Sequence, residues 1–80
     1  MNTKIITHRL IRRYPILRDQ LVSIRMHYSE LARNIGRSER YVTARMTGRG
    51  SFTLDECYAI RSAVGLTNKT IEEVFPNDEN

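Results

Sequence analysis

The stretch that decides the fold is Tyr28-Ser-Glu-Leu-Ala-Arg-Asn-Ile-Gly-Arg-Ser-Glu-Arg-Tyr-Val-Thr-Ala-Arg-Met-Thr-Gly48. Its first half predicts a short helix, because Leu31, Ala32 and Ile35 have the spacing of apolar side chains on one helical face. Gly36 follows, and glycine is the usual residue where a helix stops in a left-handed conformation. The first half therefore predicts a helix that ends in a tight turn.

The second half of the stretch predicts another helix, at residues 38–47. Ser38 offers a hydroxyl that can cap its start. Val42 and Met46 lie four residues apart and so share one face, and Gly48 marks the end. Together the two halves predict helix, glycine turn and serine-capped helix.

This arrangement resembles the helix-turn-helix of the Xre/Cro-type phage repressor family. The residues that carry the resemblance are Leu31, Ala32, Gly36, Ser38, Val42, Gly48, Leu54, Ile60, Val64, Gly65, Leu66, Val74 and Phe75. The resemblance covers roughly residues 16 to 75. It implies an all-α fold, a compact bundle of about five short helices of the lambda repressor-like DNA-binding type.

Length and composition limit the other possibilities. Eighty residues are enough for one domain, which we expect at residues 15–75, after an N-terminal extension at 1–14 and before a polar tail at 76–80. The single cysteine, Cys57, excludes an intramolecular disulfide and favours a reducing, cytoplasmic setting. No apolar run approaches the length of a membrane span, and no signal-peptide core is present, so no membrane partner is expected.

The charge is divided unevenly along the chain. Residues 1–50 hold eleven Lys and Arg against three Asp and Glu, whereas residues 51–80 hold two against six. The positive charge therefore surrounds the predicted helix-turn-helix, as expected if that part of the domain meets a polyanion. Ten of the eleven cations are arginines, whose planar guanidinium suits phosphates and guanine edges.

The extension at residues 1–14 allows two interpretations. One is a short helix with an apolar face, formed by Ile5, Ile6, Leu10, Ile11 and Tyr14. The other is an extended segment, because its start is rich in β-branched residues. It could pack on the core, mediate dimerisation or act as a basic arm over phosphates.

The next helix is predicted to begin at Pro15, because proline has no N–H to leave unsatisfied in a first turn. Leu17, Leu21 and Ile24 predict its buried stripe, and its end is expected near residues 26–27. A capping box at the following helix would be imperfect, because a histidine precedes that helix.

Two further helices are predicted after Gly48. Thr53 can cap the first, and its expected apolar face comprises Leu54, Cys57, Tyr58, Ile60 and Val64. Phe52 in the preceding loop is expected in the core, and Gly65 is expected to end the helix. The last helix is predicted to start at Thr67 or Asn68 and to end before Pro76.

The resemblance implies that the helix at residues 38–47 enters the major groove of DNA. Its outward residues are the candidate base contacts: Glu39, Arg40, Thr43, Ala44 and Thr47. Arg40 leads them, because a bidentate arginine-guanine pair is the commonest specific contact. Glu39 could instead stabilise the start of its own helix.

Candidate phosphate contacts flank this helix and the start of the preceding one: Tyr28, Ser29, Arg37, Tyr41, Arg45 and Arg49. Tyr28 takes a position that the family often gives to a phosphate-binding glutamine. Arg37 and Arg61 depart from the family, which has an aliphatic and a small residue there. Both are expected to bury their stems and keep their charges in water.

The leading functional hypothesis is a phage-type transcriptional regulator, a repressor that binds double-stranded operator DNA as a homodimer. The alternative is a protein-interaction module with the same fold, such as an antitoxin or a phage inhibitor of a host nucleic-acid enzyme. An enzyme is not expected, because the sequence has no paired-carboxylate site, metal constellation or glycine-rich phosphate loop. No cofactor or metal is expected.

Overall fold

The computed structural model describes residues 13–76. Most of the predicted N-terminal extension, residues 1–12, and the end of the predicted tail, residues 77–80, lie outside the described residues. Five helices, α2 to α6, and no strand are present in the described part of the chain. This confirms the expectation of a compact all-helical fold.

Helix α2 (Pro15–Ile24) begins at the predicted proline. Leu17 and Leu21 are buried, as their spacing predicts. Ile24 is 41% exposed, so its assignment to the same buried stripe is wrong.

The way in which α2 ends explains why Ile24 lies outside the core. Arg25 adopts a left-handed conformation with φ of 58°, which closes the helix before residues 26–27, where its end was expected. The backbone N–H of Met26 then donates to the carbonyl of Leu21 at 2.9 Å. Met26 thereby packs against the core in the place predicted for Ile24.

Helix α3 (Tyr28–Ile35) buries Leu31 and ends at Gly36, whose φ of 72° is the predicted left-handed stop. The start is also stabilised. The backbone N–H of His27 donates to the carboxylate of Glu30 at 2.8 Å, which is the acid's half of a capping box.

Helix α4 (Glu39–Met46) follows after a turn of only a few residues. The hydroxyl of Ser38 accepts a hydrogen bond from the backbone N–H of Tyr41 at 3.1 Å, so the predicted cap is confirmed. Val42 and Met46 are almost fully buried. The pair α3 and α4 therefore has the predicted order of helix, glycine turn and serine-capped helix.

Helix α5 (Leu54–Ala63) faces the core with Cys57 and Ile60. Leu54 and Tyr58 are 63% and 50% exposed, so the prediction that they belong to the apolar face is wrong. Both lie to one side of the arc that Cys57 and Ile60 define, because the helix advances about 100° per residue.

Helix α6 (Ile71–Val74) is a single turn, and the prediction of its start at residues 67–68 is wrong. Those residues belong to a turn at 66–69. The hydroxyl of Thr70 caps the helix instead, by accepting the backbone N–H of Glu73 at 3.1 Å.

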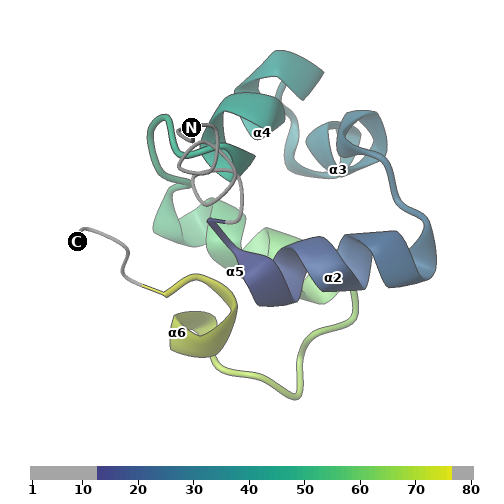
Figure 1. Cartoon of the computed structure of the whole chain (residues 1–80), viewed down its shortest axis with the longest axis vertical. Coiled ribbons are helices and arrows are strands. Elements are labelled where there is room, and N and C mark those ends of the chain that lie inside the picture. Colours follow the sequence, from purple (N-terminus) through teal and green to yellow (C-terminus); the bar gives the residue numbers. More distant parts are fainter. Residues whose placement is uncertain (1–12, 77–80) are drawn as a thin grey trace, which may run out of the picture.

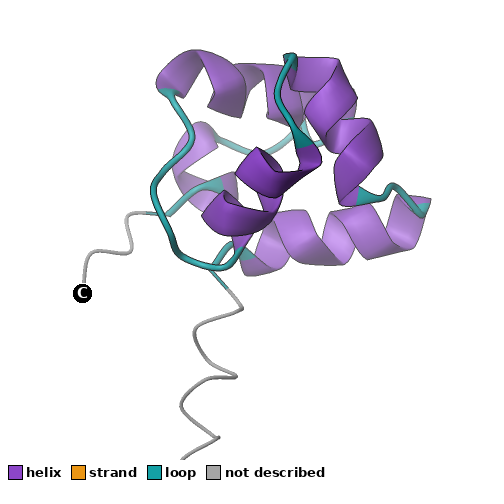
Figure 2. Ribbon diagram, turned by 90° about the horizontal axis from the view of Figure 1, so that it is seen from above, coloured by secondary structure: helices purple, strands orange, loops and turns teal. Residues whose placement is uncertain are grey.

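The helices surround one apolar core. In Figure 1, α3 and α4 lie on one side of the fold and α6 lies on the other, with α2 and α5 between them. Figure 2 shows the same helices from above, joined by short loops. The buried apolar residues are Tyr14, Leu17, Leu21, Leu31, Ala32, Val42, Met46, Phe52, Cys57, Ile60, Val64, Leu66 and Val74.

An aromatic cluster joins segments that are distant in the sequence. The ring of Tyr14 lies 5.9 Å from that of Phe52 and 5.3 Å from that of Phe75, between centroids. Phe52 is 7% exposed, which confirms its predicted place in the core. Tyr14 is 4% exposed, so this residue of the predicted extension is a core residue.

Helix α5 offers a direct test of which side holds the fold together. We expect Ile60→Ala to lower the free energy of unfolding by about 2–5 kcal/mol, because it leaves a cavity in the core. Leu54→Ala on the exposed side should change it by less than about 0.5 kcal/mol. Urea unfolding followed by circular dichroism measures both, and equal losses would contradict the assignment of the buried side.

Candidate nucleic-acid interface

Helix α4 buries its apolar side and turns its polar side outward. Glu39 and Arg40 are exposed, while Thr43, Ala44 and Thr47 are half-buried. These five predicted base contacts occupy one side of a helix that advances about 100° per residue. The structure thus brings them together on a single outward strip.

The side chains of this strip differ in the hydrogen bonds that they make within the protein. The hydroxyl of Thr47 donates to the carbonyl oxygens of Thr43 at 2.8 Å and Ala44 at 3.2 Å, in its own helix. Within residues 13–76, the side chain of Arg40 has no hydrogen-bond or ion-pair partner. Arg40 is therefore the long donor on the strip that can reach a ligand without breaking an internal contact.

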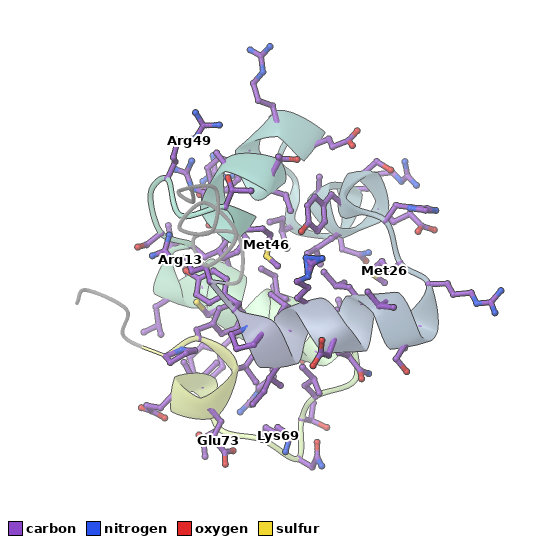
Figure 3. The ribbon with its side chains drawn as sticks, in the orientation of Figure 1. Arg13, Met26, Met46, Arg49, Lys69 and Glu73 are labelled. Carbon is purple, nitrogen blue, oxygen red and sulfur yellow. The ribbon has the colours of Figure 1, made fainter. Side chains whose placement is uncertain are left out.

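The predicted phosphate contacts lie in two places. Tyr28 and Ser29 are half-buried at the start of α3, and the ring of Tyr28 packs against the core. The others lie on α4 or beside it. Among these Arg49 is exposed, in the loop after α4 (Figure 3).

The only buried charged residue in the described part of the chain is Glu56, which is 7% exposed. Its Oε2 accepts from Nε of Arg37 at 2.7 Å. Its Oε1 accepts from the hydroxyl of Tyr41 at 2.7 Å and from the backbone N–H of Thr53 at 2.9 Å. Burial by itself raises the pKa of Glu56, but these three donors outweigh it, so the pKa lies below its ordinary value.

Glu56 lies in the first turn of α5, where an acid complements the helix dipole. The spacing of Thr53 and Glu56 is that of a capping box, and both hydrogen bonds of the box are present. This signal could have identified the role of Glu56 at the start of α5. Its pairing with Arg37 joins residues far apart in sequence and has no local signal.

Two guanidinium groups lie over the ring of Tyr41. The Cζ atoms of Arg37 and Arg45 lie 4.6 Å and 3.8 Å from its centroid, within the range of a cation–π contact. The hydroxyl, predicted to reach a phosphate, donates to Glu56 instead. This hydrogen bond, together with burial, raises the pKa of Tyr41 above its ordinary value.

Glycine at position 50 lets the loop after α4 approach Arg45. A Cβ atom on Gly50 would lie 3.1 Å from Cζ of Arg45, and the backbone there has φ of 85°. The side chain of Arg13 holds the same loop, donating to the carbonyl of Gly50 and, at 3.0 Å, to the hydroxyl of Ser51. Arg45 is therefore confined between a ring and a backbone segment.

A separate hollow of about 580 Å³ opens between the end of α2 and the starts of α3 and α4. Its lining is Arg18, Leu21, Val22, Arg25, Met26, His27, Tyr28 and Glu39. Figure 3 labels Met26 at this end of α2, on the opposite side of the view from Arg13 and Arg49. The lining of the hollow combines apolar side chains with charged ones that are mainly basic.

Between residues 13 and 76, no three His, Cys, Asp or Glu residues lie close enough together to hold a metal ion. The thiol of Cys57 is buried, which raises its pKa and keeps it protonated. None of the described helices is long and apolar enough to cross a membrane.

Comparison of the chain with protein-family models, with curated proteins and with solved structures finds no match.

The buried carboxylate predicts a pH-dependent stability. Because the pKa of Glu56 is depressed in the folded protein, its stabilising contribution is present above the ordinary value of 4.5 and is lost as the pH falls below it. We expect Glu56→Gln to lower the free energy of unfolding near neutral pH by about 1–3 kcal/mol. It should also flatten the fall in stability at acidic pH.

Urea unfolding at a series of pH values on both sides of 4.5 measures this effect. Glu72→Gln, which removes an exposed acid on α6, is the matched control and should leave the acid limb unchanged. An identical pH profile for Glu56→Gln and the parent would show that the buried carboxylate is not stabilised by its donors.

Proposed function

We propose that this protein is a sequence-specific DNA-binding transcriptional regulator of the phage-repressor type, which inserts α4 into the major groove. The observation that carries the proposal is the outward strip of α4. It offers an exposed arginine, Arg40, without an internal partner, on the second helix of a helix-turn-helix pair. A guanidinium so placed can donate two hydrogen bonds to a guanine edge.

The distribution of charge supports the same proposal. Arg37, Arg45 and Arg49 flank the strip, and within residues 13–76 only the first of them is paired with an acid. The acids of α5 and α6 lie in the half of the chain with negative net charge. A polyanion that approached α4 would meet cations first, which favours binding in one orientation.

A repressor of this type acts as a homodimer on two half-sites about one helical turn, roughly 34–36 Å, apart. Selection of bound sequences from random DNA tests this point, because a two-fold symmetric protein selects palindromic operators. A single asymmetric half-site would instead favour a monomer.

Arg40 provides the direct test of base recognition. We expect Arg40→Ala to weaken binding to the selected operator by about 1–3 kcal/mol and to relax the preference at one base pair, because the bidentate contact is lost. Lys69→Ala, which removes a cation outside the strip, should leave both unchanged. Electrophoretic shifts with operator and single-base variants measure the effect, and unaltered preference in Arg40→Ala would exclude α4 as the reading helix in this register.

The hollow at the end of α2 favours a second candidate function, a protein-interaction module. It contains the side chain of Val22, which is 70% exposed, beside Arg18 and Arg25. Exposed apolar surface with a charged rim is typical of protein contacts. A partner captured from nuclease-treated host extract, together with no shift of any DNA, would favour this candidate over the first.

A further inference from the structure

We propose that Tyr41 and Arg45 form a preassembled clamp for one backbone phosphate of double-stranded DNA, with Tyr41 and Glu56 as positioning residues. This inference rests on the proposed function and deepens it. In the clamp, the position of the Arg45 guanidinium is fixed before DNA binds.

The position of Arg45 is defined by its surroundings. Its Cζ lies 3.8 Å from the centroid of the Tyr41 ring. Gly50 approaches so closely that even a Cβ atom there would crowd the guanidinium. Two neighbours therefore restrict a side chain that is usually mobile on a helix surface.

The charge of Arg45 has no internal counterpart. Glu56, the buried acid of this site, is bound by Arg37, and no residue between 13 and 76 accepts a hydrogen bond from the guanidinium of Arg45. Its Nε is also buried without a partner. The buried Nε cannot reach a ligand from solvent, so a bound anion would use the terminal nitrogens of Arg45, which residues 13–76 leave without an acceptor.

The ring that supports Arg45 is itself anchored. The Tyr41 hydroxyl donates to Glu56 at 2.7 Å, and Glu56 is held in turn by the backbone N–H of Thr53 at 2.9 Å. The chain of contacts runs from the start of α5, through the carboxylate, to the ring. It holds the ring against rotation away from Arg45.

The loop on the other flank is fastened by Arg13. Besides its bonds to the loop, Arg13 donates to the carbonyl oxygen of Arg45 at 3.4 Å. The backbone of Arg45 and the loop that carries Gly50 are thus joined by one side chain from the beginning of the domain. This contact keeps Gly50 close to the guanidinium.

A phosphate is the ligand that suits such a group. The planar guanidinium presents parallel donors that match two phosphate oxygens, whereas a lysine ammonium has neither the plane nor the stack on a ring. Because ring and loop already restrict the side chain, less conformational freedom is lost when the phosphate binds. The clamp contributes to affinity for any sequence, since phosphates carry no base identity.

The test compares two charge-conserving substitutions. We expect Arg45→Lys to weaken binding to a short duplex of random sequence about three- to tenfold, because the stack and the fork are lost while the charge remains. Arg33→Lys is the matched control. It alters an exposed arginine of α3 that is not among the candidate DNA contacts and makes no ring contact in the described residues, and it should weaken binding less than about twofold.

Fluorescence anisotropy at several salt concentrations separates the clamp from a general loss of charge. Arg45→Lys should keep the parent's dependence of log K on log salt, while Arg45→Ala should reduce that slope by about 0.9, the value for one phosphate. Circular dichroism and the unfolding midpoint of each variant confirm that the fold is intact.

The role of Tyr41 is tested by coupling. Tyr41→Leu removes the ring, and we expect it to weaken binding about as much as Arg45→Lys, with the double variant scarcely weaker than either single one. Independent, additive losses would overturn the role of Tyr41 as a positioning residue. Arg45→Lys leaves every donor to Glu56 in place, so the main test stands even if the Tyr41 variant is unstable.

The outcomes distinguish the clamp from the proposed function. If the parent binds the duplex and Arg45→Lys binds it equally well, or Arg33→Lys is weakened as much, the clamp is overturned and DNA binding stands. If the parent binds no duplex even at low salt, both are overturned.

Discussion

The burial of a single carboxylate constrains the whole α3–α4 side of this protein. A buried charge is tolerated only when its hydrogen-bonding capacity is filled, and Glu56 receives its donors from the turn after α3, from α4 and from its own helix start. A movement of α4 relative to α5 would therefore break hydrogen bonds to the carboxylate of Glu56. The orientation of α4 thus depends on the hydrogen bonds to Glu56. The direction in which the outward strip faces depends on them as well.

Much of this architecture could be predicted from short stretches of sequence, because the forces involved act within one or two turns. Pro15, Gly36, Ser38 and Thr53 each solve a local problem of backbone conformation or an unsatisfied N–H group, and each has the predicted place. The outward strip of α4 follows from the helical period once its buried residues are known.

The rest depends on contacts between distant segments, which local patterns do not encode. Leu54 satisfies the apolar pattern of α5, yet its side chain is 63% exposed. Tyr14 looks like the end of an appendage, and its burial depends on two rings that follow much later in the chain. Arg37 forms an ion pair with a buried acid in α5, and nothing in the sequence near either residue marks this pair. The residues of the candidate site could therefore be named from the sequence, but the contacts between them could not be predicted.

The contact between Tyr14 and Phe75 has a topological consequence. It brings the first and last parts of the described chain together, at 5.3 Å between ring centroids, so the five helices form a nearly closed circuit. A circularly permuted variant that linked these two segments and opened at the turn of residues 66–69 would leave the loop from α3 to α4 uncut. The order of the segments along the chain would change, while the packing around the buried carboxylate would not.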